Sequence, residues 1–169
     1  MPGESSAVIS DTGTLEVVEN VAPTVVTAHT LDVDGRWNNA LSVAMEAMVY
    51  MVDRALTKHE KVHFLNIAGN HDINAGIAVR EVIRVAFKDN PRVIVDEAPS
   101  NIKYHQHGKT LLQFAHGDGM KMRQSGEAMA VDCRDIFSTT THRFAHFGHT
   151  HKDAVVDMPI CRAESHRNI

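Results

Sequence analysis

Residues 62–72 read VHFLNIAGNHD, and this stretch decides the fold. Val62 to Ala68 is a mostly apolar run of strand length, and Gly69-Asn70-His71-Asp72 follows it directly. A short apolar run bounded by a turn is typical of a buried strand. In an α/β domain, ligand groups from distant parts of the chain meet at the ends of such strands. We therefore expect a buried strand here, with functional side chains at its carboxyl end.

Helical patterns flank this strand on both sides. Residues 36–58 repeat apolar side chains at spacings of three and four, which predicts an amphipathic helix. A second helix is expected at about residues 75–87, before Asn90-Pro91, and residues 92–96 form the next strand. A strand-helix-strand run of this kind predicts a right-handed crossover and a parallel pair.

The second half of the chain has a different pattern. Residues 102–107 and 110–115 are short runs joined by Gly108-Lys109, which predicts a hairpin. We also expect a weak helix at 126–137, a strand at 144–147, and a last hairpin formed by residues 155–156 and 160–163. Residues 1–35 are poorly defined apart from a short strand at 7–10. Parallel strands and helices followed by hairpins favour a single domain over residues 1–169, a layered α/β sandwich with helices outside.

The composition is that of an ordinary globular protein. The chain has 169 residues, 43% of them hydrophobic and 22% charged, enough for one domain with a substantial core. A net charge of -4 gives no general attraction to nucleic acid or anionic membranes, although bound metal ions could supply local positive charge. No apolar run approaches the roughly 18 residues that span a bilayer. The start lacks a signal-peptide pattern, and Cys133 and Cys161 show no paired motif, so we expect a cytoplasmic protein with two free thiols and no membrane partner.

Twelve histidines are many for this length, and several lie in three short segments after apolar runs. The segments are Gly69-Asn70-His71-Asp72, His116-Gly117-Asp118 and Gly148-His149-Thr150-His151. A carboxamide and several imidazoles that meet in space form a site for a divalent transition metal. Each segment also has a plain structural interpretation. The last could be a surface turn, His116 could be a hydrogen-bonded structural histidine, and Asp72 or Asn74 could cap the following helix.

Together, the three segments resemble the calcineurin-like metallophosphoesterase superfamily in their order and in their position after strands. The resemblance covers about residues 60–164. It implies a four-layer α-β-β-α sandwich that holds two divalent metal ions, manganese most often and otherwise iron or zinc. An aspartate and a water or hydroxide bridge the two ions in this superfamily.

The resemblance also assigns roles to residues. It makes Asn70, His116 and His149 ligands of one metal and His151 a ligand of the other. It makes His71 the catalytic histidine beside the phosphate, and Asp72 is placed to orient the His71 ring. The implied reaction is hydrolysis of a phosphate ester by a metal-bound hydroxide.

The amino-terminal motifs of the superfamily are not intact in this chain. The superfamily begins with Asp-x-His and continues with Gly-Asp-x-x-Asp, whose aspartate bridges the metals. Here, Asp11 is either the bridging aspartate, with Ser10 in place of glycine, or the first aspartate without its histidine. The 59 residues from Asp11 to Asn70 (70 − 11) leave room for the helix at 36–58 and favour the bridging position. We therefore expect an N-terminally incomplete metallophosphoesterase fold, either a fragment or a reduced homologue.

The functional prediction is a metal-dependent hydrolase of phosphate esters, a phosphodiesterase or a phosphatase. Asp72 after Asn70-His71 favours a nuclease-like, phage-type member that acts on nucleic acid. The missing first motif supports an alternative, a catalytically impaired metal-binding or scaffold domain. A third hypothesis is a plain α/β domain with structural histidines. The sequence leaves the oligomeric state undetermined.

Overall fold

The computed structural model describes residues 6–11, 37–70 and 73–167. In chain order, the first part contains β1 (Ser6–Asp11), α1 (Trp37–Leu56), β2 (Lys61–Asn66), α2 (Ile73–Ala86) and β3 (Val93–Val95). The second part contains β4 (Ile102–His107), β5 (Thr110–Ala115), the 3-10 helix η1 (Met122–Gln124), α3 (Ser125–Asp132), α4 (Arg134–Thr139), β6 (His142–Phe147), β7 (Ala154–Asp157) and β8 (Arg162–Ser165).

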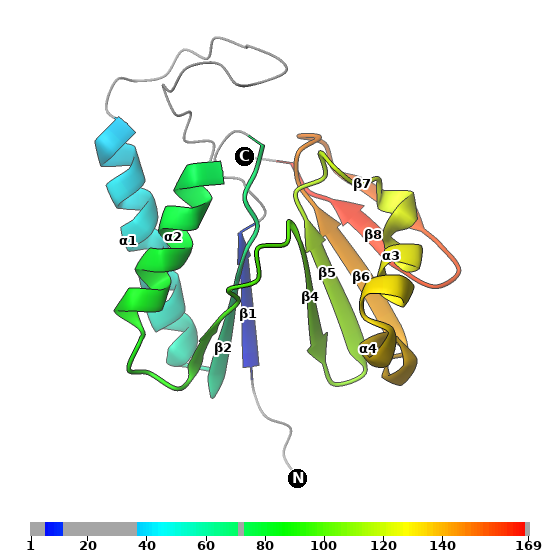
Figure 1. Ribbon diagram of the computed structural model, residues 1–169, viewed down its shortest axis with the longest axis horizontal. Coiled ribbons are helices and arrows are strands. Elements are labelled where there is room, and N and C mark those ends of the chain that lie inside the picture. Colours follow the sequence, from blue (N-terminus) through cyan, green and yellow to red (C-terminus); the bar gives the residue numbers. More distant parts are fainter. Residues whose placement is uncertain (1–5, 12–36, 71–72, 168–169) are drawn as a thin grey trace.

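The strands form two sheets. The first has the order β1-β2-β3 and is parallel throughout. The second has the order β4-β5-β6-β8-β7 and is mixed, with parallel pairs β5-β6 and β6-β8 at its centre and an antiparallel hairpin at each edge. Figure 1 shows α1 and α2 on the outer side of the first sheet and α3 and α4 on the outer side of the second. The protein is therefore a mixed α/β fold in which helices cover two stacked sheets.

The alternation of side chains along β2 explains this stacking. Val62 and Phe64 point to one face and are completely buried with Val52 of α1 and Ile83 of α2. Successive residues of a strand point to opposite faces, so Leu65 and Ile67 lie on the other side. One strand thus supplies apolar side chains to the helices on one face and to the second sheet on the other.

The contact between the two sheets is smaller. Leu65 and Ile67 pack with Phe114 of β5, and Leu112 contacts this cluster. The rings of His63 and His105 also meet between the sheets, with centroids 4.6 Å apart. The gap between the sheets therefore contains imidazoles as well as apolar side chains.

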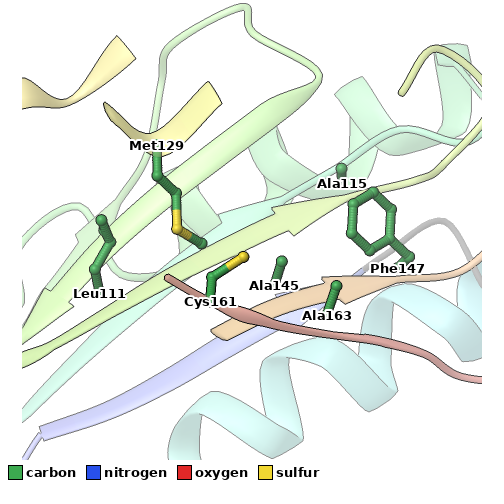
Figure 2. Packing of buried hydrophobic residues seen from close by; sticks show 7 residues of the cluster. All are labelled: Leu111, Ala115, Met129, Ala145, Phe147, Cys161 and Ala163. Atoms are coloured by element: carbon green, nitrogen blue, oxygen red, sulfur yellow. The ribbon is translucent and has the colours of Figure 1, made fainter. Parts of the chain in front are cut away.

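A third cluster fills the space between the second sheet and α3 (Figure 2). Met129 of α3 is completely buried there. The other buried residues of this cluster come from β5, β6, β8 and the turn before β8: Leu111, Ala115, Ala145, Phe147, Cys161 and Ala163. The small alanines of β6 and β8 leave space for the methionine and phenylalanine side chains, so large and small residues interlock.

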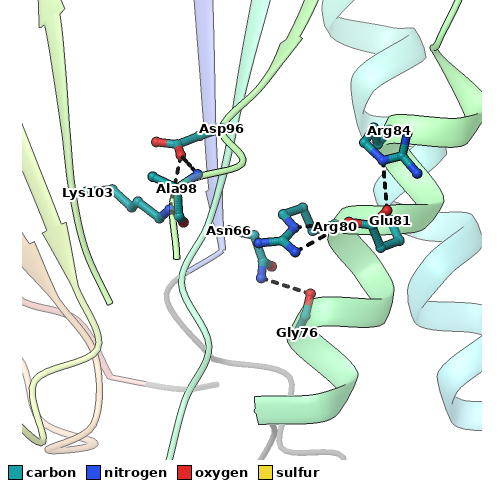
Figure 3. Close-up of polar contacts among 8 residues, drawn as sticks. All are labelled: Asn66, Gly76, Arg80, Glu81, Arg84, Asp96, Ala98 and Lys103. Atoms are coloured by element: carbon teal, nitrogen blue, oxygen red, sulfur yellow. Dashed lines mark hydrogen bonds and ion pairs between the residues drawn. The ribbon is translucent and has the colours of Figure 1, made fainter. Parts of the chain in front are cut away.

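Polar contacts fix the ends of the first sheet (Figure 3). The side-chain amide of Asn66 donates to the carbonyl oxygen of Gly76 at 2.9 Å, which joins the end of β2 to the first turns of α2. A Cβ at Gly76 would lie 3.1 Å from the Cβ of Ala68, so glycine allows this close approach. Beyond β3, the buried Lys103 ammonium forms an ion pair with Asp96 at 3.0 Å and also donates to the carbonyl of Ala98.

Most of the predicted elements are confirmed. The hairpin of 102–107 and 110–115 is found with the predicted bounds, and Gly108 at its turn has a left-handed φ of 55°. The parallel pair on either side of α2 and the hairpin of β7 and β8 are also present. Cys133 and Cys161 are free thiols, as expected. Within the part of the chain that the structure describes, none of the helices combines the length and apolarity needed to cross a membrane.

Several element boundaries differ from the prediction. The helix expected to begin at Ala75 begins at Ile73. The weak helix of 126–137 is two short helices, α3 and α4, separated at Cys133. The last strand is Arg162–Ser165 instead of 160–163, because the β7-β8 turn extends through residue 161. This shift places Glu164 within the sheet.

Candidate metal centre

The centre begins where two parallel strands end side by side. Ala115 and Phe147 are register partners at the ends of β5 and β6, so His116 and Gly148 are the next residues of adjacent chains. The backbone N–H of Gly148 donates to the carbonyl oxygen of His116 at 3.0 Å. The two segments predicted to supply ligands are therefore joined at the backbone.

The side chains of Asn70, His116 and His149 converge on one point. The Nε2 atom of His116 lies 2.8 Å from Oδ1 of Asn70 and 3.2 Å from Nδ1 of His149. The two imidazole rings meet edge to face, with centroids 4.9 Å apart and planes at 69°. Asn70 comes from the loop after β2 in the first sheet, so this contact joins the ends of both sheets.

The backbone of the last loop is bent tightly around His149. The N–H of Thr150 donates to the carbonyl oxygen of Gly148 at 2.7 Å, and His149 between them has a φ of 62°. A three-residue turn with positive φ at its centre is rare and strained. His151 also has a positive φ, 51°, and left-handed conformations at two histidines cost roughly 1–2 kcal/mol each. Strain of this kind clusters at functional sites, where the surrounding structure maintains it.

The donor atoms suit a transition metal. Neutral imidazole nitrogens and an amide oxygen carry lone pairs that can bind a divalent cation. In a tetrahedral zinc site with bonds of about 2.0–2.1 Å, neighbouring ligand atoms are about 3.3 Å apart. The distances of 2.8 and 3.2 Å at His116 are close to that spacing, so small movements would let an ion enter. His116 is only 7% exposed, which holds its ring in place.

The other predicted site residues are less completely described. His71 and Asp72 lie outside the described residues. The main chain places Asp11 at the end of β1, beside Asn66 of β2, while its side chain is outside the description. His151 lies two residues after His149 in the same loop and is exposed to solvent. The roles assigned to these four residues stay predictions.

A second group of metal-ligand side chains lies on the second sheet. His146 of β6, Glu164 of β8 and His166 just after β8 each offer one ligand atom, and these atoms all lie within 4.8 Å of one another. Nδ1 of His146 is 3.1 Å from Nε2 of His166. Burial, and then the nearby His166, lowers the pKa of His146, and a hydrogen bond from Arg162 lowers the pKa of Glu164.

The sequence patterns did not point to this second group. His146 lies 18 or more residues before the other two members, on a strand that is not consecutive in the chain with the strand of Glu164 (164 − 146 = 18). The only local signal is Glu164-x-His166, whose spacing of two puts both side chains on one face of a strand. That signal was not visible because the last strand was expected to end at residue 163.

The chain is structurally similar to a predicted phosphoesterase. The solved structure is described as a conserved uncharacterized protein from Streptococcus pneumoniae TIGR4. The two chains align with a TM-score of 0.37 and 13% sequence identity, over 100% of this chain and 75% of the other. No protein-family model matches the sequence, and no curated protein matches it significantly.

Proposed function

We propose that the protein is a metal-dependent phosphoesterase whose layered sheets form an α-β-β-α sandwich of the metallophosphoesterase type. The observation that supports this most directly is the convergence of Asn70, His116 and His149. These three residues come from two sheets and three loops, and Nε2 of His116 lies within 3.2 Å of a donor atom from each of the other two. The three motifs in which they occur are those whose order resembles the superfamily.

In this proposal, Asn70, His116 and His149 hold one ion of a pair. Divalent ions such as manganese, iron or zinc would polarise phosphate oxygens and make a nearby water more acidic. The chain's own residues position the ligand groups. The bond between the Gly148 N–H and the His116 carbonyl holds two ligand loops together, and the buried ring of His116 keeps its nitrogen directed at Asn70.

The remaining roles rest on the sequence motifs. His71 donates a proton to the leaving oxygen or stabilises charge on the phosphoryl group, and Asp72 orients it. His151 and Asp11 contribute to the second ion. Because an aspartate follows Asn70-His71, we favour a phosphodiester substrate of the nucleic-acid type.

Hydrolysis of bis-p-nitrophenyl phosphate with added manganese tests the proposal. We expect the wild type to turn over and the His71→Ala variant to be slower by about 100-fold or more, the range for loss of a proton-transfer group. His71→Ala should keep its metal, whereas Asn70→Ala and His149→Ala should lose metal affinity. His142→Asn is a matched control, since His142 is an exposed histidine at the start of β6.

Metal content separates this function from the alternative. About two ions per chain with turnover support the enzyme. One ion or none, with wild-type turnover equal to that of His71→Ala, would show a metal-binding or scaffold domain. Equal metal loss in His71→Ala and His149→Ala would contradict the catalytic role of His71.

A further inference from the structure

We infer that His146, Glu164 and His166 form a second, independent binding site for a divalent transition metal of the zinc class, on the face of the second sheet that points away from α3. This site goes beyond the phosphoesterase centre and shares no residue with it. None of the three histidine-bearing segments at 69–72, 116–118 and 148–151 includes these side chains. The inference rests on how β6 and β8 place them.

The sheet itself brings the three ligands together. His146 and Glu164 are register partners on the parallel strands β6 and β8, so their side chains lie next to each other on one face. His166 is two residues after Glu164 and lies on the same face. Its backbone N–H donates to the carbonyl oxygen of Phe147 at 2.8 Å, which extends the pairing past the end of β8 and fixes its position.

The rings are held by stacking. His146 packs against Phe114 on one side, with centroids 5.5 Å apart, and against His166 on the other, with centroids 5.3 Å apart. Both pairs have planes inclined by 23°. A ring confined between two others has few orientations, so Nδ1 of His146 stays directed at Nε2 of His166. This fixed orientation reduces the entropy lost when a ligand binds.

The carboxylate supplies the charge and is itself positioned. Oε1 of Glu164 accepts a hydrogen bond from Nε of Arg162 at 2.7 Å, which leaves its second oxygen for a cation. Arg162 also approaches Asp157 at 3.5 Å, so the guanidinium has a second carboxylate to balance its charge. Hydrogen-bonded outer partners of this kind orient metal ligands.

The ligand set selects the ion. Two imidazole nitrogens and one carboxylate oxygen, with a fourth position for water, are a known ligand set for zinc. In such a site the two nitrogens are about 3.3 Å apart. Nδ1 of His146 and Nε2 of His166 are 3.1 Å apart, near that value. All three ligand atoms lie within 4.8 Å of one another, so Glu164 needs only a small movement to bind the same ion. Hard ions that require six oxygen ligands fit this set poorly.

Zinc titration of the full chain, in competition with a chromophoric chelator, tests the site. The Asn70→Ala/His149→Ala variant, which removes two of the three ligands that hold one ion of the first centre, should still bind zinc at the site of His146, Glu164 and His166. Adding His166→Asn to that variant should weaken binding by about tenfold or more, and Glu164→Gln should act in the same direction. His142→Asn, at an exposed position on the same face of β6, should leave the affinity unchanged.

Cobalt provides an independent spectroscopic measurement. The Asn70→Ala/His149→Ala variant with Co²⁺ should show the visible absorption of a four-coordinate ion, and His166→Asn should abolish it. Circular dichroism without metal establishes that each variant is folded. The inference is overturned if folded His166→Asn binds zinc as tightly as His142→Asn, or if the variant of the first centre binds no zinc. Either result leaves the phosphoesterase proposal to its own test with His71→Ala.

Discussion

Gly117 and His149 approach each other so closely that a Cβ added to Gly117 would lie 3.4 Å from the Cβ of His149. Gly117 also has a φ of 115°, a conformation that side-chain-bearing residues rarely adopt. The glycine after His116 therefore serves two purposes. It turns the chain at the end of β5, and it leaves room for the strained loop that contains His149.

Replacing Gly117 with alanine should lower both stability and metal affinity. The positive φ costs roughly 1–2 kcal/mol with a Cβ present, and relief of this strain would shift the backbone with which His149 is in van der Waals contact. We expect a lower free energy of unfolding in urea and weaker manganese binding by the Gly117→Ala chain. Gly119→Ala is the control, because nothing lies within 4 Å of a Cβ there and the residue is exposed. Equal effects at both glycines would show that the approach of Gly117 to His149 is unimportant.

Manganese should stabilise the folded protein through the centre at Asn70. A ligand that binds only the folded state adds about 2.7 kcal/mol at 100 times its dissociation constant. We expect a rise in the thermal midpoint with manganese, reversal by a chelator, and a much smaller rise in Asn70→Ala. Asn101→Ala, in an exposed loop after β3, should respond like the wild type. A manganese response that survives Asn70→Ala would remove Asn70 from the ligand set.

Acid should destabilise the fold through the histidines between the sheets. Burial is the main reason that the pKa values of His63 and His105 lie below their usual 6.5, and neighbouring positive groups lower them further. The unfolded chain then binds protons at a higher pH than the folded chain, so the free energy of unfolding falls as the pH drops through 6.5. The loss stops only below the lowered folded pKa values.

Urea unfolding at a series of pH values from 8 to 5 measures this dependence. His105→Phe removes one titrating group from the pair and should give a shallower slope than the wild type. His142→Phe, at an exposed position for which no such burial applies, should keep the wild-type slope. A steeper slope in His105→Phe would reverse the sign argued above.

Arg92 should stabilise the end of α1. Its guanidinium donates to the carbonyl oxygens of Leu56, His59 and Glu60 at 2.7, 2.6 and 2.8 Å. A helix leaves its last carbonyls without partners inside the helix, and a cation at that end also suits the helix dipole. We expect Arg92→Ala to lower the free energy of unfolding by about 1–2 kcal/mol. Arg92→Lys should recover part of the loss, since an ammonium keeps the charge but not the fork; no difference between alanine and lysine would argue against the cap.

Local patterns in the sequence predicted much of the architecture. The alternation of β4 and β5 and the spacing of apolar residues in α1 depend only on residues close together in the chain, so the pattern suffices to locate them. The motifs also identified Asn70, His116 and His149 as a group, and the structure brings these three together. The proximity of His116 and His149 follows from topology, since the parallel strands β5 and β6 of one sheet end at the same edge, whereas the contact of Asn70 with them joins the ends of the two sheets.

The sequence by itself thus determined which segments are strands and helices and which side chains gather at the strand ends. Only the tertiary structure decided that β6 pairs with β8 instead of β7, and with it the meeting of His146, Glu164 and His166. The left-handed turn at His149 likewise depends on contacts with Gly117 and His116. Strand order and backbone strain are set by the free energy of long-range packing, which is summed over the whole molecule and has no signature in any short stretch of sequence.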